Sequence, residues 1–134
     1  MKIYYKRNGV EVTGATNIKH FNELNNFNNI EYLELDNVLR MLNLQNVITV
    51  LRAVYARMAA GGELYISDYD SQMIANQVKF QQITIEEFNQ KLFEQGNVSC
   101  LALFWLKVHL EQMGFQVKEC GYGYNKDFWI EVIK

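Results

Sequence analysis

Several features that mark particular protein classes are missing from this sequence of 134 residues. It contains no proline and only two cysteines, Cys100 and Cys120, which are too few for a disulfide framework and lack the C-x-x-C spacing of metal and redox sites. No apolar run approaches the roughly 20 residues that cross a membrane, and the opening MKIYYKRNG lacks the apolar core of a secretion signal. We therefore expect a reduced, cytoplasmic protein with no membrane partner.

An excess of positive charge is also missing. The sequence has 13 Lys and Arg against 15 Asp and Glu, a net charge of −2, and its basic residues are scattered singly. A nucleic-acid-binding surface needs a basic patch, so nucleic acid is not an expected partner. The composition that remains, 49% hydrophobic and 21% charged residues, is typical of a globular protein, and the length fits a single domain over residues 1–134.

The polarity pattern that predicts secondary structure is weakest in the first 29 residues. Residues 2–7 alternate in polarity, and Asn8-Gly9 followed by residues 10–13 predicts a β-hairpin. Apolar residues at helical spacing within residues 16–25 indicate a helical turn, and the asparagines crowded there are typical of a solvated loop. We expect a divergent hairpin and loop ahead of the main part of the domain.

Residues 30–134 alternate strands with helices. Strands are predicted at residues 30–36, 64–67, 116–120 and 127–133, and helices at 44–60, 71–80, 85–96 and 101–113. Gly61-Gly62 and Gly114 predict helix ends, Thr84 is a predicted N-cap, and Ser99 or Asn97 can cap the last helix. This order favours an α/β fold, a mostly parallel sheet with helices on its faces and a C-terminal antiparallel hairpin.

Two stretches resemble the class I S-adenosylmethionine-dependent methyltransferases. Residues 51–70, LRAVYARMAAGGELYISDYD, resemble the family pattern L-x-E-x-x-R-V-L-K-P-G-G-x-L-x-I-x-x-x-D. The matching positions are Arg57, Met58, Gly61, Gly62, Leu64, Ile66 and Asp70. Residues 106–115, LKVHLEQMGF, resemble the family's L-x-x-L-L-x-x-x-G-F helix. The resemblance covers the chain from about residue 30 onward and implies a partial Rossmann-like sheet with S-adenosylmethionine as the cofactor.

The same resemblance implies a truncated or degenerate member of the family. The family holds its cofactor with a glycine-rich loop after the first strand, whereas residues 6–14 read KRNGVEVTG. The acidic residue that ends the family's second strand has only Glu11 as a formal counterpart, and residues 37–41 read NVLRM where relatives that modify small molecules or glycans show H-V-L-E-H. The expected cofactor is therefore S-adenosylmethionine in an incomplete site, or none.

Polar residues at the carboxyl ends of two predicted strands are the candidate ligand-binding residues, because open α/β sheets bind ligands outside these ends. They are Asp36, Asn37, Ser67, Asp68 and Asp70. The alternative is that they cap helices and satisfy turns. No catalytic residue and no metal ligand is assigned, because neither His20 nor His109 has a partner at a catalytic or metal-ligand spacing, and His109 is expected to be structural.

Two functions remain open. One is a methyltransferase-like protein with an incomplete cofactor site that acts on a small molecule or glycan. The other is a non-catalytic interaction or dimerisation module on the same fold. The aromatic residues Tyr122, Tyr124, Phe128 and Trp129 could stack on an adenine or a sugar, but the alternation along residues 127–133 favours one face in the core and one at an interface. A homodimer is therefore an expected assembly.

Overall fold

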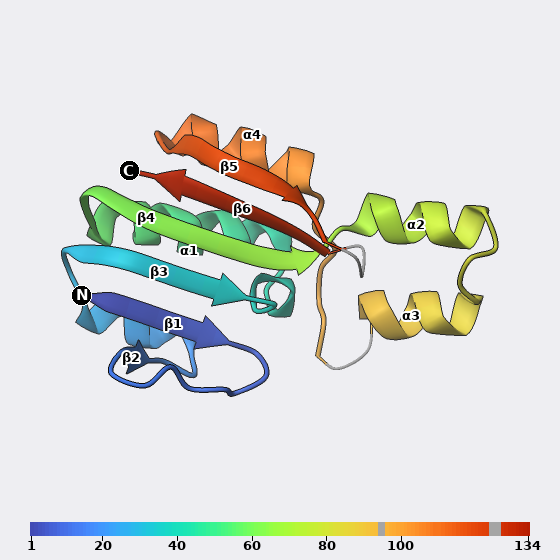
Figure 1. Ribbon diagram of the computed structural model, residues 1–134, viewed down its shortest axis with the longest axis horizontal. Coiled ribbons are helices and arrows are strands. Elements are labelled where there is room, and N and C mark those ends of the chain that lie inside the picture. The colour runs from blue at the N-terminus through green and yellow to red at the C-terminus, as the bar shows by residue number, and fades with distance from the viewer. Residues whose placement is uncertain (94–95, 124–126) are drawn as a thin grey trace.

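The computed structural model describes residues 1–93, 96–123 and 127–134. At its centre is a six-stranded sheet with the strand order β2-β1-β3-β4-β6-β5 (Figure 1). The strands are β1 Lys2–Lys6, β2 Thr16–Asn17, β3 Ile30–Asp36, β4 Met58–Tyr69, β5 Gln116–Tyr122 and β6 Asp127–Ile133. Strands β1 to β4 are parallel, and β6 is antiparallel to both β4 and β5. The predicted mostly parallel α/β sheet with a C-terminal antiparallel hairpin is confirmed.

The helices lie on one face and at one end of this sheet. They are the 3-10 helices η1 Phe21–Asn26 and η2 Leu39–Met41, and the α-helices α1 Leu44–Arg57, α2 Ser71–Lys79, α3 Ile85–Phe93 and α4 Leu103–Met113. The hydrophobic core joins η1, α1 and α4 to the sheet through buried residues such as Leu24, Leu51 and Leu106. Helices α2 and α3 project beyond the carboxyl ends of the parallel strands (Figure 1). No helix within the described ranges is long and apolar enough to cross a membrane.

The predicted N-terminal hairpin is wrong. The chain turns after β1, residues 10–13 form no strand, and β2 runs parallel to β1 with Thr16 opposite Ile3. On its other side β1 pairs in parallel with β3, where Tyr5 lies opposite Leu35. This arrangement buries Ile3 and Tyr5 in the core, whereas an isolated two-stranded hairpin would leave them in water. The helical turn predicted nearby is present as η1.

The sequence predicts that Gly61-Gly62 ends the first helix, and this prediction is wrong. Helix α1 ends at Arg57, and Gly61 and Gly62 lie inside β4. Gly61 has a φ of +76°, and a Cβ on Gly62 would lie 2.7 Å from the carbonyl oxygen of Ile30. The pairing of β3 with β4 shifts register at this point, between Ile30 and Tyr32. Glycine is therefore required by an irregularity in the sheet rather than by a helix cap.

Two other predicted helix ends are confirmed. Gly114 follows α4 with a φ of +109°, a left-handed conformation that glycine adopts without strain. Thr84 caps α3, because its Oγ1 accepts a hydrogen bond of 3.1 Å from the backbone N–H of Glu87. Local sequence signals thus hold where the backbone is governed by its own neighbours.

Candidate functional site

The carboxyl ends of β1, β3 and β4 meet at one edge of the sheet, because these strands are parallel neighbours. Lys6 lies opposite Asp36, which in turn lies opposite Ser67. The Arg7 backbone N–H donates to the carbonyl of Asp36 at 3.0 Å, and the Asn37 backbone N–H donates to the carbonyl of Ser67 at 2.8 Å. These bonds fix the three strand ends against one another at the place where open α/β sheets bind ligands.

Three of the predicted site residues, Asp36, Asn37 and Ser67, form one hydrogen-bonded group. Oδ1 of Asp36 accepts hydrogen bonds of 2.8 Å from both Ser67 Oγ and Asn37 Nδ2. Asn37 has a φ of +57°, in the left-handed region that asparagine enters more readily than most residues. Its Oδ1 is buried without a hydrogen-bond partner, which leaves an acceptor at the strand end for a ligand.

Asp68 follows Ser67 on β4, so its side chain lies on the other face of the strand, where it is fully buried. Its Oδ1 forms an ion pair with Nε of Arg40 and accepts a hydrogen bond of 2.8 Å from the Tyr69 backbone N–H. Burial raises the pKa of Asp68 from 3.8 to about 6, because the attraction of Arg40 offsets only part of the cost of removing the carboxylate from water. Asp68 is therefore connected to the ligand-binding edge through Arg40 and the Tyr69 backbone, and its own carboxylate stays buried.

Asp70 joins the first turns of two helices. Its Oδ1 accepts a hydrogen bond of 3.0 Å from the Met73 backbone N–H in α2, and its Oδ2 accepts one of 2.8 Å from the Leu103 backbone N–H in α4. Neither Ser99 nor Asn97 caps α4, so that prediction is wrong. Asp70 is fully buried, and both of its carboxylate oxygens accept hydrogen bonds from backbone N–H groups. Its role in the structure is therefore helix capping, the alternative to ligand binding that the sequence also allows for these residues.

Two adjoining pockets open at the carboxyl edge of the sheet. The first has a volume of about 340 Å³ and is lined by Arg7, Asn8, Asn37, Arg40 and Tyr69. The second has a volume of about 510 Å³ and is lined by Tyr5, Lys6, Arg7, Gly9, Lys19, Met41 and Gly96. Arg7 belongs to both linings. The larger pocket carries three cationic side chains, and no carboxylate belongs to its described lining.

These basic residues are not predicted from the sequence. Lys6 and Arg7 end a strand that the sequence assigns to an isolated hairpin, so nothing brings them to the ligand-binding edge. Parallel pairing of β1 with β3 puts them there. Lys19 joins them because β2 runs parallel to β1 and ends at the same edge. The available signal was the Lys-Arg pair directly after the first apolar strand.

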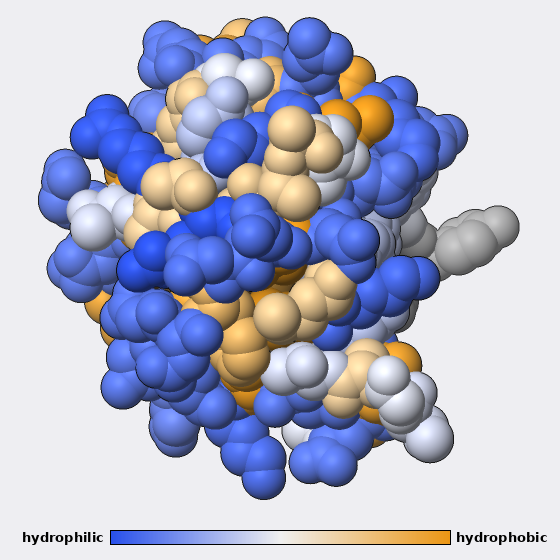
Figure 2. All heavy atoms as spheres, turned by 90° about the vertical axis from the view of Figure 1, so that its left-hand side faces the viewer, coloured by the Kyte–Doolittle hydropathy of each residue, from blue (hydrophilic) through white to orange (hydrophobic). Residues whose placement is uncertain are grey.

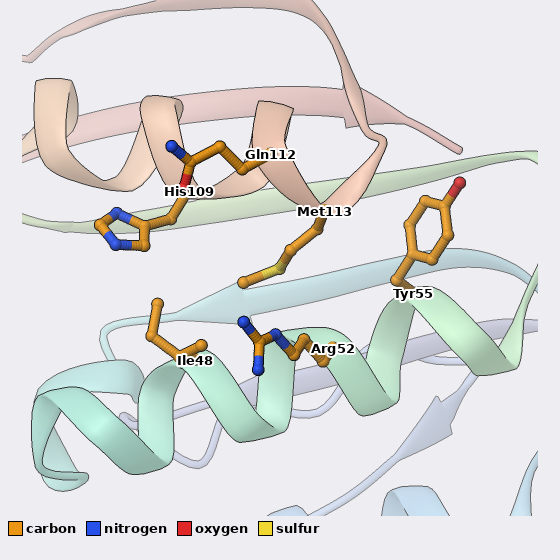
Figure 3. Close-up of a pocket in the computed structure, with 6 residues that line it drawn as sticks. All are labelled: Ile48, Arg52, Tyr55, His109, Gln112 and Met113. Carbon is orange, nitrogen blue, oxygen red and sulfur yellow. The ribbon is translucent and has the colours of Figure 1, made fainter.

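A third pocket, of about 300 Å³, lies between α1 and α4, away from the strand ends (Figure 3). Its lining includes His109, whose Nδ1 donates to the carbonyl of Trp105 at 2.8 Å. The centroids of the His109 imidazole and the Trp105 indole lie 4.2 Å apart. The imidazole is thereby held against its own helix, which is the structural role expected of it. Within the described ranges, no group of three or more His, Cys, Asp or Glu residues is arranged to hold a metal ion.

The aromatic residues near the C-terminus separate onto two faces of the sheet. Phe128 is fully buried in the core, Trp129 alternates to the other face, and Tyr122 is 50% exposed. Tyr124 lies outside the described residues.

The opposite end of the molecule, where the parallel strands begin, is mainly hydrophilic with small apolar patches (Figure 2). The carboxyl edge of the sheet, with its two adjoining pockets, is therefore the better candidate site.

Comparison with known proteins identifies the fold. No family model matches the sequence, and no curated protein matches it. Among solved structures, a SAM-dependent methyltransferase from Archaeoglobus fulgidus matches with a TM-score of 0.69 and 10% identity, over 99% of this chain and 86% of that one. An S-adenosylmethionine-dependent methyltransferase from Mesorhizobium loti matches with a TM-score of 0.67 and 9% identity, over 99% and 90% of the two chains.

A third similar structure contains a ligand. The 1,6-didemethyltoxoflavin-N1-methyltransferase of Burkholderia thailandensis, with bound 1,6-didemethyltoxoflavin and S-adenosylhomocysteine, matches with a TM-score of 0.63 and 10% identity, over 99% of this chain and 70% of that one. At such low identity the likeness establishes the fold alone. The chain has the fold of S-adenosylmethionine-dependent methyltransferases.

Proposed function

We propose that this chain is a methyltransferase-like protein whose cofactor site is incomplete, and that the site binds a small anionic molecule without transferring a methyl group. The observation that carries this proposal is the lining of the larger strand-end pocket, which presents Lys6, Arg7 and Lys19 and no described carboxylate. S-adenosylmethionine carries a positive sulfonium and an ammonium group against one carboxylate, which gives it a net positive charge. A cationic lining therefore favours a phosphate ligand, which is negative overall, more than S-adenosylmethionine.

The loop after β1 also fails to fit the family's cofactor. Methyltransferases of the family that the sequence resembles have a glycine-rich turn here, but this chain has Arg7 and Asn8, and residues 7–15 lead to β2 without forming a helix. A helix N-terminus at this place would offer free N–H groups to the ligand. The residue that follows β2 by two positions is Lys19 rather than a carboxylate, and Glu11 lies in the loop before β2.

The two pockets divide the binding of an anionic molecule between them. In the larger pocket Lys6 is paired with Glu34 at 3.2 Å. Lys19 lies in the same lining and adds a cationic side chain that suits a phosphate. In the smaller pocket the charge of Arg40 is balanced by Asp68, and Arg7 is the other cationic residue of the lining. Asn37 and the ring of Tyr69 there suit an uncharged, hydrogen-bonding part of the same molecule.

Thermal unfolding with three separate probes tests the proposal: adenosine monophosphate, S-adenosylmethionine and S-adenosylhomocysteine. A ligand that binds only the folded state stabilises it by about 2.7 kcal/mol at 100 times its Kd. We expect adenosine monophosphate to raise the Tm, less so as salt is added, and S-adenosylmethionine to leave it unchanged. A rise with S-adenosylmethionine or S-adenosylhomocysteine alone would overturn the proposal and support the methyltransferase activity that the resemblance implies.

A further inference from the structure

One face of the sheet carries no helix within the described part of the chain. Helices α1, α4 and η1 cover the other face, which forms the hydrophobic core (Figure 1). We use the term open face for the side chains that alternate away from the core on strands β1, β3, β4 and β6. They include Tyr4, Lys6, Tyr32, Glu34, Tyr65, Ser67, Trp129 and Glu131. None of these residues belongs to the core, although each is half-buried by its neighbours.

Aromatic rings make up much of the open face. The rings of Tyr4 and Tyr32, on neighbouring strands, lie 5.5 Å apart. The indole of Trp129 lies against Gly121 on β5, where a Cβ would be 3.2 Å from the ring. Tyrosine and tryptophan are enriched in the centres of protein interfaces, because they bury a large area and lose few rotamers on binding. The aromatic content of this face is therefore unusual for a surface that stays in water.

The charged groups of the open face already have partners within it. Glu34 accepts from Lys6 at 3.2 Å and from the hydroxyl of Tyr32 at 3.3 Å. Burial and the charge of Glu34 raise the pKa of Tyr32, so its hydroxyl remains a donor. Lys118 of β5 bridges Glu63 and Glu131 at 3.1 and 3.0 Å. Paired charges cost less to bury than isolated ones, and a surface with both signs does not repel its own copy.

The edges of the sheet are poor sites for association. Strand β2 has only two residues, Thr16 and Asn17. Strand β5, at the other edge, shifts register between Val117 and Glu119 and presents Lys118 to solvent. Short strands, irregular pairing and edge lysines all oppose the addition of another strand. A partner of this sheet therefore has a face, rather than an edge, on which to pack.

We propose that the open face packs against the open face of a second copy of this chain. Together with β5 at the edge, the four strands of the open face lie about 4.8 Å apart, rise about 3.3 Å per residue and cover roughly 500 Å² in projection. Its corrugated accessible surface is larger, and a stable interface needs about 800 Å² from each partner. Sheets also pack face to face at about 10 Å with aligned strands, which suits a two-fold symmetric pair. The argument for this assembly does not depend on the ligand proposed above, although Lys6 belongs both to the open face and to the lining of the larger pocket.

Sedimentation velocity over a range of protein concentrations tests the proposal. We expect the wild-type chain to be a dimer at micromolar concentration, and Tyr65→Glu on β4 to raise the dimer Kd by about tenfold or more. The matched control is Phe104→Glu, since Phe104 lies on α4 and is 72% exposed. This control should leave the dimer unchanged.

Three results would overturn the proposal: a wild-type chain that stays monomeric, a Tyr65→Glu dimer as stable as the wild type, or dissociation caused by Phe104→Glu. Circular dichroism establishes that each variant is folded. If Tyr65→Glu does not fold, Tyr4→Glu makes the same test from β1, at a position nearer the rim of the face.

Discussion

Arg40 and Asp68 form a buried ion pair where the sheet meets the helices at its carboxyl edge. Arg40 is 3% exposed, and its side chain also donates to the carbonyl of Lys91 at 2.7 Å. Its own carbonyl accepts from the backbone N–H groups of Val98 and Ser99 at 2.7 and 3.2 Å. One residue of η2 thus connects the sheet, α3 and the segment after α3, next to the proposed ligand site.

Removing one member of this pair should be costly. Arg40→Met leaves the carboxylate of Asp68 buried without an opposite charge, so at pH 7 we expect the free energy of unfolding to fall by about 3–5 kcal/mol. Replacing both residues, as Arg40→Met with Asp68→Leu, should recover much of that loss. Urea unfolding measures both effects. Arg52→Met, at an exposed arginine, should change stability by less than about 0.5 kcal/mol. A double variant no better than the single one would contradict this expectation.

The raised pKa of Asp68 predicts a pH dependence. The pKa is 3.8 for an ordinary aspartate and about 6 in the folded chain, so between these pH values the native state holds a proton that the unfolded state has released. The contribution of Asp68 to the free energy of unfolding is therefore fully present below about pH 4 and is lost as the pH rises through 6, a change on the order of 3 kcal/mol.

Urea unfolding of the wild type and of the double variant, from pH 4 to pH 7, isolates this contribution. The difference in stability between the two proteins should fall over this range, because the variant lacks the carboxylate. A constant difference would mean that Asp68 is ionised throughout.

Asp70→Ala removes two helix caps at once. It leaves the backbone N–H groups of Met73 and Leu103 without their acceptor, so we expect a loss of about 2–4 kcal/mol in urea unfolding. Thr84→Ala is the matched control, because it removes a single exposed cap and should cost about 1 kcal/mol or less. Equal losses in the two variants would exclude a double capping role for Asp70.

The two glycines of β4 should respond differently to alanine. Gly62→Ala places a Cβ 2.7 Å from the backbone oxygen of Ile30, which cannot move without disturbing β3, so we expect a loss of about 2–3 kcal/mol. Gly61→Ala has open space and pays only for its positive φ, about 1 kcal/mol. Thermal unfolding of the pair distinguishes the two causes, and the reverse order would refute the assignment.

The basic pocket makes a prediction about ligand affinity. Lys19→Ala removes a cation from its lining, so we expect the Kd of adenosine monophosphate, measured by calorimetry, to rise about tenfold. Lys107→Ala on α4, where the lysine is 43% exposed, changes the net charge equally and should have little effect. Equal losses of affinity in both variants would indicate that binding depends on overall charge and not on this pocket.

Much of the fold is determined by local sequence. The strand Ile30–Asp36, the start of α1 at Leu44 and the end of α4 at Gly114 are all predicted correctly. Each depends on side-chain periodicity or on a backbone angle that neighbouring residues set. The same local signals locate Asp36, Asn37 and Ser67 at strand ends, and the parallel pairing then brings them into contact.

Tertiary structure decided what local pattern does not encode. Asn8-Gly9 is a strong hairpin signal. However, β1 lies between β2 and β3, and this pairing stabilises the fold more because it buries Ile3 and Tyr5 in the core. That choice alone brings Arg7 and Lys19 to the candidate site and makes it basic. The second helix cap on Asp70 joins residues 33 positions apart. The sequence by itself determined the elements and their order, and long-range pairing decided which side chains share the site and which face of the sheet stays open.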